Sequence, residues 1–171
     1  NRLVLVGGRD VDGATTATLL YDISVGTWSP GPPLAFARDG ATATLLGDGR
    51  VLVAGGLDAL GAPVAALEVL DAAATSWSKL AAPLAVARAH HKVAVLADGR
   101  VLVAGGVDAS SAPTASAEIV DAVAGTVAAA ADLPEARTDH AAIALPDGTV
   151  LVAGGLDASS TPLASTVIFT P

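Results

Sequence analysis

Residues 92–108 read KVAVLADGRVLVAGGVD, and this stretch decides the fold. Two short apolar runs, Lys92–Leu96 and Val101–Ala104, flank Asp98-Gly99. That dipeptide is typical of a two-residue turn between antiparallel strands. The second run is rich in β-branched residues and ends at Gly105-Gly106, as expected of a strand that is buried on both faces. The stretch therefore predicts a β-hairpin whose second strand ends at a diglycine.

The diglycine recurs along the whole chain at intervals of 48, 50 and 49 residues. Its four copies are Gly7-Gly8, Gly55-Gly56, Gly105-Gly106 and Gly154-Gly155. Three further landmarks keep nearly the same step: Arg38, Arg88 and Arg137; Asp22, Asp71 and Asp121; Trp28 and Trp77. Such a period is the signature of a repeat architecture. It predicts a single array over residues 1–171, with approximate units 1–37, 38–87, 88–136 and 137–171.

Each full period contains four strand signals, which we name a to d from the inside of the repeat outward. The hairpin supplies strands a and b, a run such as Leu67–Leu70 or Ala117–Val120 supplies strand c, and a short run around Trp77 supplies strand d. In the third unit, Val127 stands in place of that Trp. The first unit begins in strand b at residues 1–8 and the last ends in strand c, so the sequence predicts 14 strands.

These patterns resemble the kelch repeats of the galactose oxidase central-domain superfamily. The resemblance rests on Val-Leu-Val-Ala-Gly-Gly, on an apolar strand that ends in Tyr21-Asp22 or Leu70-Asp71, on a Trp six residues after that Asp, and on the Pro-Leu and Arg that follow. It implies an all-β fold, namely a kelch-type β-propeller segment of four-stranded antiparallel blades. Because propellers close with about four to eight blades, we expect an open arc or part of a ring closed by another chain.

Two sets of repeated residues are expected to have structural roles. The glycines end strand b where neighbouring backbones crowd and a Cβ would clash or require a strained dihedral angle. Trp28 and Trp77 are large enough to fill the wedge between adjacent blades. The glycines in question are Gly55, Gly56, Gly105, Gly106, Gly154 and Gly155.

Composition excludes several classes of function. With 17 acidic and 9 basic residues, the chain has a formal charge of −8, which argues against a nucleic-acid partner because phosphates require clustered Lys and Arg. It has no cysteine, so disulfides, thiolate nucleophiles and cysteine-containing metal sites are excluded. No apolar run approaches the roughly 20 residues that span a bilayer, and no signal peptide is recognisable.

The candidate binding residues are charged or polar residues at fixed positions in the repeat. The arginines lie in the loops from strand d into strand a, and repeated aspartates lie in the loops from strand b to strand c, on the same propeller face. The arginines either pair with an acid or carbonyl of the neighbouring blade or form a ring that grips carboxylate or phosphate groups. The aspartates either bond these arginines or form Asx turns. The histidines either pack between blades or ligate a metal ion, which would need three or four converging donors. The set is Arg38, Arg88, Arg137, Asp58, Asp108, Asp157, His91 and His140.

The sequence predicts no catalytic residues, no cofactor and no tightly bound transition metal. The copper oxidase of the superfamily needs a Cys crosslinked to a Tyr, and this chain has no Cys. Plant kelch specifier proteins bind iron through a Glu-x3-Asp-x3-His pattern; Glu135 and Asp139 match it, but Ile143 occupies the third position. Asp10-x-Asp12-Gly13 resembles the start of a calcium loop without the later Glu, so calcium remains an alternative there to a structural turn.

The leading functional hypothesis is a non-catalytic kelch propeller module for binding or scaffolding, with a protein or carbohydrate ligand. The alternatives are an enzyme similar to bacterial kelch sugar mutarotases and an inactive propeller fragment. The resemblance and the acidic, cysteine-free composition favour a secreted or cell-surface protein of bacterial origin. Unpaired edges at the ends of an arc predict self-association, as a dimer of arcs, or completion by blades of a longer parent chain.

Overall fold

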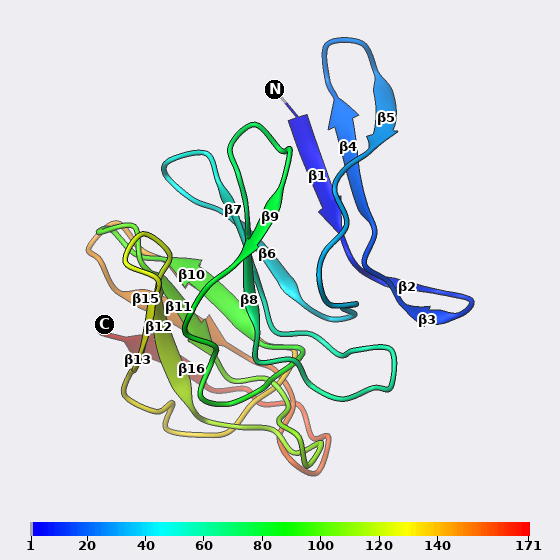
Figure 1. Ribbon diagram of the computed structural model, residues 1–171. Coiled ribbons are helices and arrows are strands. Elements are labelled where there is room, and N and C mark those ends of the chain that lie inside the picture. Colours follow the sequence, from blue (N-terminus) through cyan, green and yellow to red (C-terminus); the bar gives the residue numbers. More distant parts are fainter. Residues whose placement is uncertain (1) are drawn as a thin grey trace.

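The computed structural model describes residues 2–171, which form strands, turns and loops arranged as a curved row of small sheets (Figure 1). Blade 1 contains β1 (Arg2–Val6), β4 (Thr18–Asp22) and β5 (Thr27–Pro30). Blade 2 contains β6 (Thr42–Leu45), β7 (Val51–Ala54), β8 (Leu67–Leu70) and β9 (Trp77–Lys79). Blade 3 contains β10 (Lys92–Val95), β11 (Val101–Ala104), β12 (Ala117–Asp121) and β13 (Thr126–Ala129). Blade 4 contains β14 (Ala141–Ala144), β15 (Val150–Ala153) and β16 (Thr166–Phe169).

The all-β prediction is confirmed, and the 14 blade strands lie where the repeat places them. Neighbouring strands within each blade are antiparallel. The described chain has two additional strands, β2 (Arg9–Asp10) and β3 (Gly13–Ala14), which form a small hairpin. Sequence analysis missed this hairpin because its strands are only two residues long. No helix among the described residues is long and apolar enough to cross a membrane.

The loop between strands a and b is longer than the two-residue turn predicted from Asp98-Gly99. Leu96 donates a backbone hydrogen bond to Arg100 O (2.8 Å), and Gly99 donates one to Leu96 O (2.9 Å). Gly99 has φ = 84°, so it is the left-handed residue that ends a three-residue loop. The Asp98 carboxylate accepts a bond from Arg100 N, and its role is to hold the turn rather than to occupy a type I′ position.

The core lies between successive blades. One face of blade 2, with Leu52 and Val69, packs against Val101, Val103 and Val120 of blade 3. The opposite face of blade 3, with Leu102 and Ala117, packs in the same way against Val150 and Val152 of blade 4. Because blade 3 lies between two neighbouring blades, its strand β11 is apolar and buried on both faces, and each blade is stabilised by the next.

Candidate functional site

The repeated arginines lie in the interior of the protein, and each contacts the blade whose strand a it precedes. Arg88 is completely buried, and its guanidinium donates to Glu118 Oε1 at 2.7 Å and to the carbonyls of Gly105 and Ser116 at 2.9 and 2.8 Å. The acceptors suggested from sequence, in the neighbouring blade, are therefore not the ones used. A guanidinium has several donors in a fixed fork. One arginine can therefore connect the loop that precedes strand a both to the end of strand b and to strand c.

Arg38 repeats this arrangement in blade 2. Its side chain bonds Gly55 O at 2.6 Å and Glu68 Oε1 at 3.0 Å, and the second oxygen of Glu68 accepts from Ala35 N at 2.7 Å. Burial lowers the pKa of Arg38, whereas hydrogen bonding and charge attraction from Glu68 oppose that shift. Sequence analysis missed Glu68 and Glu118, although both follow their arginine by 30 residues.

In blade 4 the buried arginine is also paired with a glutamate, but that glutamate comes from the loop before strand a rather than from strand c. Val167 occupies the position of the strand c glutamate, and Glu135, two residues before Arg137, supplies the carboxylate at 3.3 Å. Ser165 Oγ accepts from Arg137 at 2.9 Å and donates to Glu135 at 2.9 Å. In both arrangements the buried guanidinium forms an ion pair and hydrogen bonds with the residues around it.

The repeated aspartates hold their own loops. Asp58 Oδ1 accepts from Leu60 N at 2.8 Å and from Ala62 N at 2.9 Å, which is the geometry of an Asx turn. Asp157 forms the same pair of bonds, and Asp108 adds one from Ser110 Oγ that lowers the pKa of its carboxyl. In the β2–β3 hairpin, Asp10 Oδ1 likewise accepts from Asp12 N at 2.9 Å.

His91 and His140 lie between the diglycines of adjacent blades. The His91 ring lies so close to Gly55 that a Cβ there would be 2.5 Å from its Cε1, and its own Cβ lies against Gly106. His91 Nε2 is 2.9 Å from Thr42 Oγ1. Burial lowers the pKa of His91 to about 3 and that of His140 to about 4, so both rings are neutral at pH 7. Within residues 2–171, no group of three or more His, Asp or Glu side chains is placed to hold a metal ion.

Each tryptophan lies on the outer strand of its blade. Trp77 donates from Nε1 to Thr18 Oγ1 at 3.2 Å and to Pro32 O at 3.0 Å, so it joins blade 2 to blade 1. Trp28, on the outward face of blade 1, packs against the ring of Tyr21 and is 52 % exposed.

The arrangement that sequence analysis missed lies two residues after each arginine, at Gly40, His90 and Asp139. All three have left-handed backbone, with φ of 65°, 55° and 52°. His90 N donates to Gly40 O at 3.1 Å, and Asp139 N donates to His90 O at 3.2 Å. A chain of backbone hydrogen bonds therefore runs from blade to blade through the ends of these loops, next to strand a. We call the surface formed by Gly40, His90 and Asp139 the inner mouth. The left-handed region is uncommon for residues other than Gly, and such residues concentrate at functional sites.

The side chains of the inner mouth differ although their backbones are equivalent. His90 Nδ1 lies 3.5 Å from Asp139 Oδ1, and both side chains are exposed. The His90 ring also covers Gly40, where a Cβ would lie 3.0 Å from its Cε1. Beside them, Arg9 Nε pairs with Asp39 Oδ2 at 3.1 Å. The sequence signal was the reverse of the one that reveals a repeat, because this position varies between copies while the arginine two residues before it recurs.

Comparison with known proteins supports the architecture. A solved structure of YjhT, a kelch-repeat propeller protein, is similar with a TM-score of 0.76 and 18 % sequence identity, over 92 % of this chain and 50 % of that one. The fold is thus that of kelch-type propeller blades, and the chain spans about half the length of the structure that it matches. No family model matches the sequence, and no curated protein matches it.

Proposed function

We propose that the chain is a non-catalytic recognition module that binds a basic segment of a protein partner across the inner mouth. The observation that carries the proposal is the placement of Gly40, His90 and Asp139 at one repeat position, with equivalent backbone and different side chains. A rigid scaffold that presents varied, exposed loop residues is the usual basis of recognition. The buried arginines stiffen this scaffold because each fixes the loop that carries a mouth residue.

The charge of the surrounding loops favours a cationic partner. The three repeated arginines of these loops are buried, which leaves Arg9 and His90 as the exposed basic side chains beside the inner mouth. Eight aspartates of the same two loop sets are exposed or half-buried: Asp10, Asp12, Asp39, Asp58, Asp108, Asp132, Asp139 and Asp157. Since complementary potentials raise association rates and select partners, this face suits Lys- and Arg-rich segments.

Binding of an oligolysine peptide, followed by isothermal titration calorimetry at low and physiological salt, tests the proposal. We expect binding that weakens with salt and that Asp139→Asn weakens by about tenfold, which corresponds to roughly 1.4 kcal/mol. Asp98→Asn is the matched control, because it removes one carboxylate charge from a loop between strands a and b at the other end of the blade. Equal weakening by both variants would mean that net charge alone attracts the peptide and would overturn the assignment to the inner mouth.

A second candidate is an enzyme similar to the bacterial kelch sugar mutarotases. It is favoured by the His90–Asp139 pair, because an exposed His facing a carboxylate can transfer protons. Exchange between sugar anomers, measured by NMR with wild-type protein and with His90→Ala, distinguishes the two functions. Acceleration that His90→Ala abolishes would replace the recognition module with the enzyme.

We also infer that two arcs associate head to tail through the apolar faces of their terminal blades. Leu3, Leu5 and Trp28 are more than half exposed on blade 1, and so are Ile143 and Ile168 on blade 4. At the equivalent positions inside the arc, Val53 and Ala94 are buried, and Ala94 packs in the cluster shared by blades 3 and 4. The exposed face of blade 4 is therefore of the kind that packs, inside the arc, against a face like the exposed one of blade 1. Two arcs together have about the length of the solved propeller chain.

A further inference from the structure

The chain contains five Asp-Gly pairs, the dipeptide in which a protein most readily rearranges its own backbone. The backbone nitrogen of the residue after an aspartate can attack the side-chain carboxyl carbon, and a glycine hinders this attack least because it has no Cβ. Whether a given pair reacts depends on how the fold holds its carboxylate and its amide. The pairs are Asp12-Gly13, Asp39-Gly40, Asp48-Gly49, Asp98-Gly99 and Asp147-Gly148.

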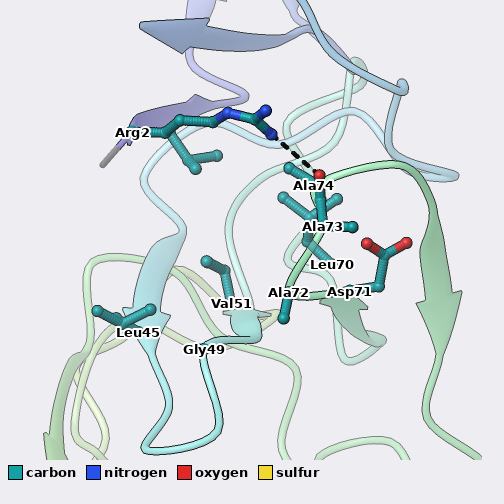
Figure 2. A pocket seen from close by; sticks show the side chains of 10 residues that line it. Arg2, Leu45, Gly49, Val51, Leu70, Asp71, Ala72, Ala73 and Ala74 are labelled. Atoms are coloured by element: carbon teal, nitrogen blue, oxygen red, sulfur yellow. Dashed lines mark hydrogen bonds between the residues drawn. The ribbon is translucent and has the colours of Figure 1, made fainter. Parts of the chain in front are cut away.

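Three of these pairs lie in the loops between strands a and b, where hydrogen bonds hold both reacting groups. The Asp48 carboxylate accepts from Arg50 N at 3.1 Å and from Arg50 Nε at 2.7 Å. Gly49 N donates to Leu46 O at 3.0 Å, so its proton is shared with a carbonyl. Figure 2 shows this loop from close by, with Gly49 among the residues that line a pocket. Equivalent bonds hold the pairs Asp98-Gly99 and Asp147-Gly148.

The pair Asp39-Gly40 is held by contacts of its loop with other parts of the protein. Asp39 Oδ2 is paired with Arg9 Nε at 3.1 Å, and the Asp39 backbone exchanges hydrogen bonds of 2.9 and 2.6 Å with Leu57. The His90 ring covers Gly40, where a Cβ would lie 3.0 Å from its Cε1. The backbone of this pair therefore cannot rearrange without disturbing the neighbouring blades.

Asp12-Gly13 is the pair that the fold leaves free. It lies at the tip of the hairpin formed by β2 and β3, which projects from the row of blades in Figure 1. Among residues 2–171, no donor bonds the exposed Asp12 carboxylate and no cation pairs with it. A Cβ on Gly13 would have one atom within 4 Å, Ala59 O at 3.8 Å, so the space around Gly13 is open. The hairpin is held by two pairs of residues, and so short a ladder opens readily.

We propose that Asp12 is a modification site at which the chain converts spontaneously to isoaspartate. Gly13 N attacks Asp12 Cγ and forms a C–N bond, while the amide proton and the carboxyl hydroxyl group leave together as water. The product is a cyclic succinimide. Water then adds to one of its two carbonyl carbons and breaks the bond from that carbon to the nitrogen, which gives either aspartate or isoaspartate. Isoaspartate keeps the negative charge and lengthens the backbone of the hairpin tip by a methylene group.

Incubation of the folded 171-residue chain at neutral pH and physiological temperature tests the proposal. Peptide mapping with electron-transfer fragmentation distinguishes isoaspartate from aspartate at each pair and detects the succinimide by its loss of water. We expect isoaspartate at Asp12 to form at least about tenfold faster than at any of the other four pairs, because those must first open locally.

The same incubation in guanidinium chloride separates the effect of the fold from that of the local sequence. The unfolded chain has none of the contacts that hold the other pairs, so all five should react at similar rates. An advantage of Asp12 that persists unchanged in the unfolded chain would overturn the proposal, since neighbouring residues rather than the fold would then select the site.

Two variants identify the reacting residue. Asp12→Glu keeps the charge but lengthens the side chain, so the five-membered ring cannot form and the reaction at this position should be lost. Asp48→Glu is the matched control and should leave the reaction at Asp12 unchanged. Equal unfolding temperatures establish that both variants are folded. A folded wild-type chain in which Asp12 reacts no faster than Asp39 or Asp48 would also overturn the proposal.

Discussion

The three repeated arginines show why a charged side chain can be a core residue in a blade. An interior guanidinium is tolerated when its donors are satisfied and its charge is paired, and Arg88 meets both conditions through Glu118 and two carbonyls. The pair also explains the recurrence of the arginine, since the loop, strand b and strand c all depend on it.

Arg88→Ala should therefore lower the free energy of unfolding by about 3–5 kcal/mol, because it leaves the carboxylate of Glu118 buried without its counter-charge. Arg100→Ala is the matched control: its ion pair with Asp98 is 42 % and 50 % exposed, so its removal should cost less than about 1 kcal/mol. Urea unfolding measures both values. Arg88→Met combined with Glu118→Leu should recover much of the loss, and similar losses from Arg88→Ala and Arg100→Ala would contradict a buried pair.

The buried histidines make stability depend on pH. Their pKa values lie at about 3 for His91 and about 4 for His140 in the folded chain, below the ordinary 6.5, because burial disfavours the charged ring. The unfolded chain thus binds more protons, so the contribution to stability is complete above pH 6.5 and declines as the pH falls toward these values.

Lowering the pH from 7 to 5 should reduce the free energy of unfolding by about 2 kcal/mol for each of these histidines. Urea unfolding at the two pH values measures the change. His91→Asn and His140→Asn should each remove about half of the dependence, provided that the variant remains folded at pH 7. A pH dependence that persists in both variants would place its origin elsewhere.

The sequence could predict only in part which repeated side chains are buried in the structure and which are exposed for binding a partner. Recurrence identified Arg38, Arg88 and Arg137, but it could not distinguish an interior position from a surface position, because both recur. Their glutamate partners are distant in sequence, and in blade 4 the partner moves to Glu135. His90 and Asp139 were missed because their importance depends on backbone geometry that joins separate blades.

At the scale of elements, the diglycine was the most informative signal because it reflects a close approach of two backbones. A Cβ on Gly106 would meet His91 N at 2.9 Å and the His91 Cβ at 2.8 Å, besides Ala89 O. Patterns of apolar side chains do not reveal this close approach. The recurrence of residues without a side chain, the two glycines, does reveal it. The β2–β3 hairpin has no comparable mark, and the three-residue loop at Asp98-Gly99 uses the same dipeptide as a shorter turn.

Gly106→Ala should accordingly destabilise the protein by more than about 3 kcal/mol, since both the positive φ and the clash oppose it. Gly125→Ala separates the two effects: Gly125 has φ = 70°, and a Cβ there meets nothing within 4 Å, so its cost should be about 1 kcal/mol. Thermal or urea unfolding compares the variants. Equal costs would show that dihedral strain alone conserves the diglycine in the repeat.

At the scale of the whole molecule, the decisive feature is that each blade has two different faces. Inside the arc, the face that carries Leu52 or Leu102 always packs against the opposite kind of face, which carries Val101 or Val150. The exposed terminal faces are one of each kind, on blade 4 and on blade 1. Contact between two copies is then heterologous, and because an arc curves, two such contacts would close a ring.

Size-exclusion chromatography with light scattering should therefore find a mass of about twice 16.6 kDa. Trp28→Glu and Ile168→Glu each damage one kind of face, and each variant alone should be monomeric because every junction contains the damaged face. An equimolar mixture should regain a heterodimer, since the intact blade 4 face of Trp28→Glu meets the intact blade 1 face of Ile168→Glu. Val123→Glu, at a residue 85 % exposed in the loop between β12 and β13, should leave the dimer intact.

A folded wild-type monomer across a wide concentration range would contradict the association itself. A dimer that persists in both Trp28→Glu and Ile168→Glu would contradict the head-to-tail arrangement, and so would a mixture of the two variants that stays monomeric.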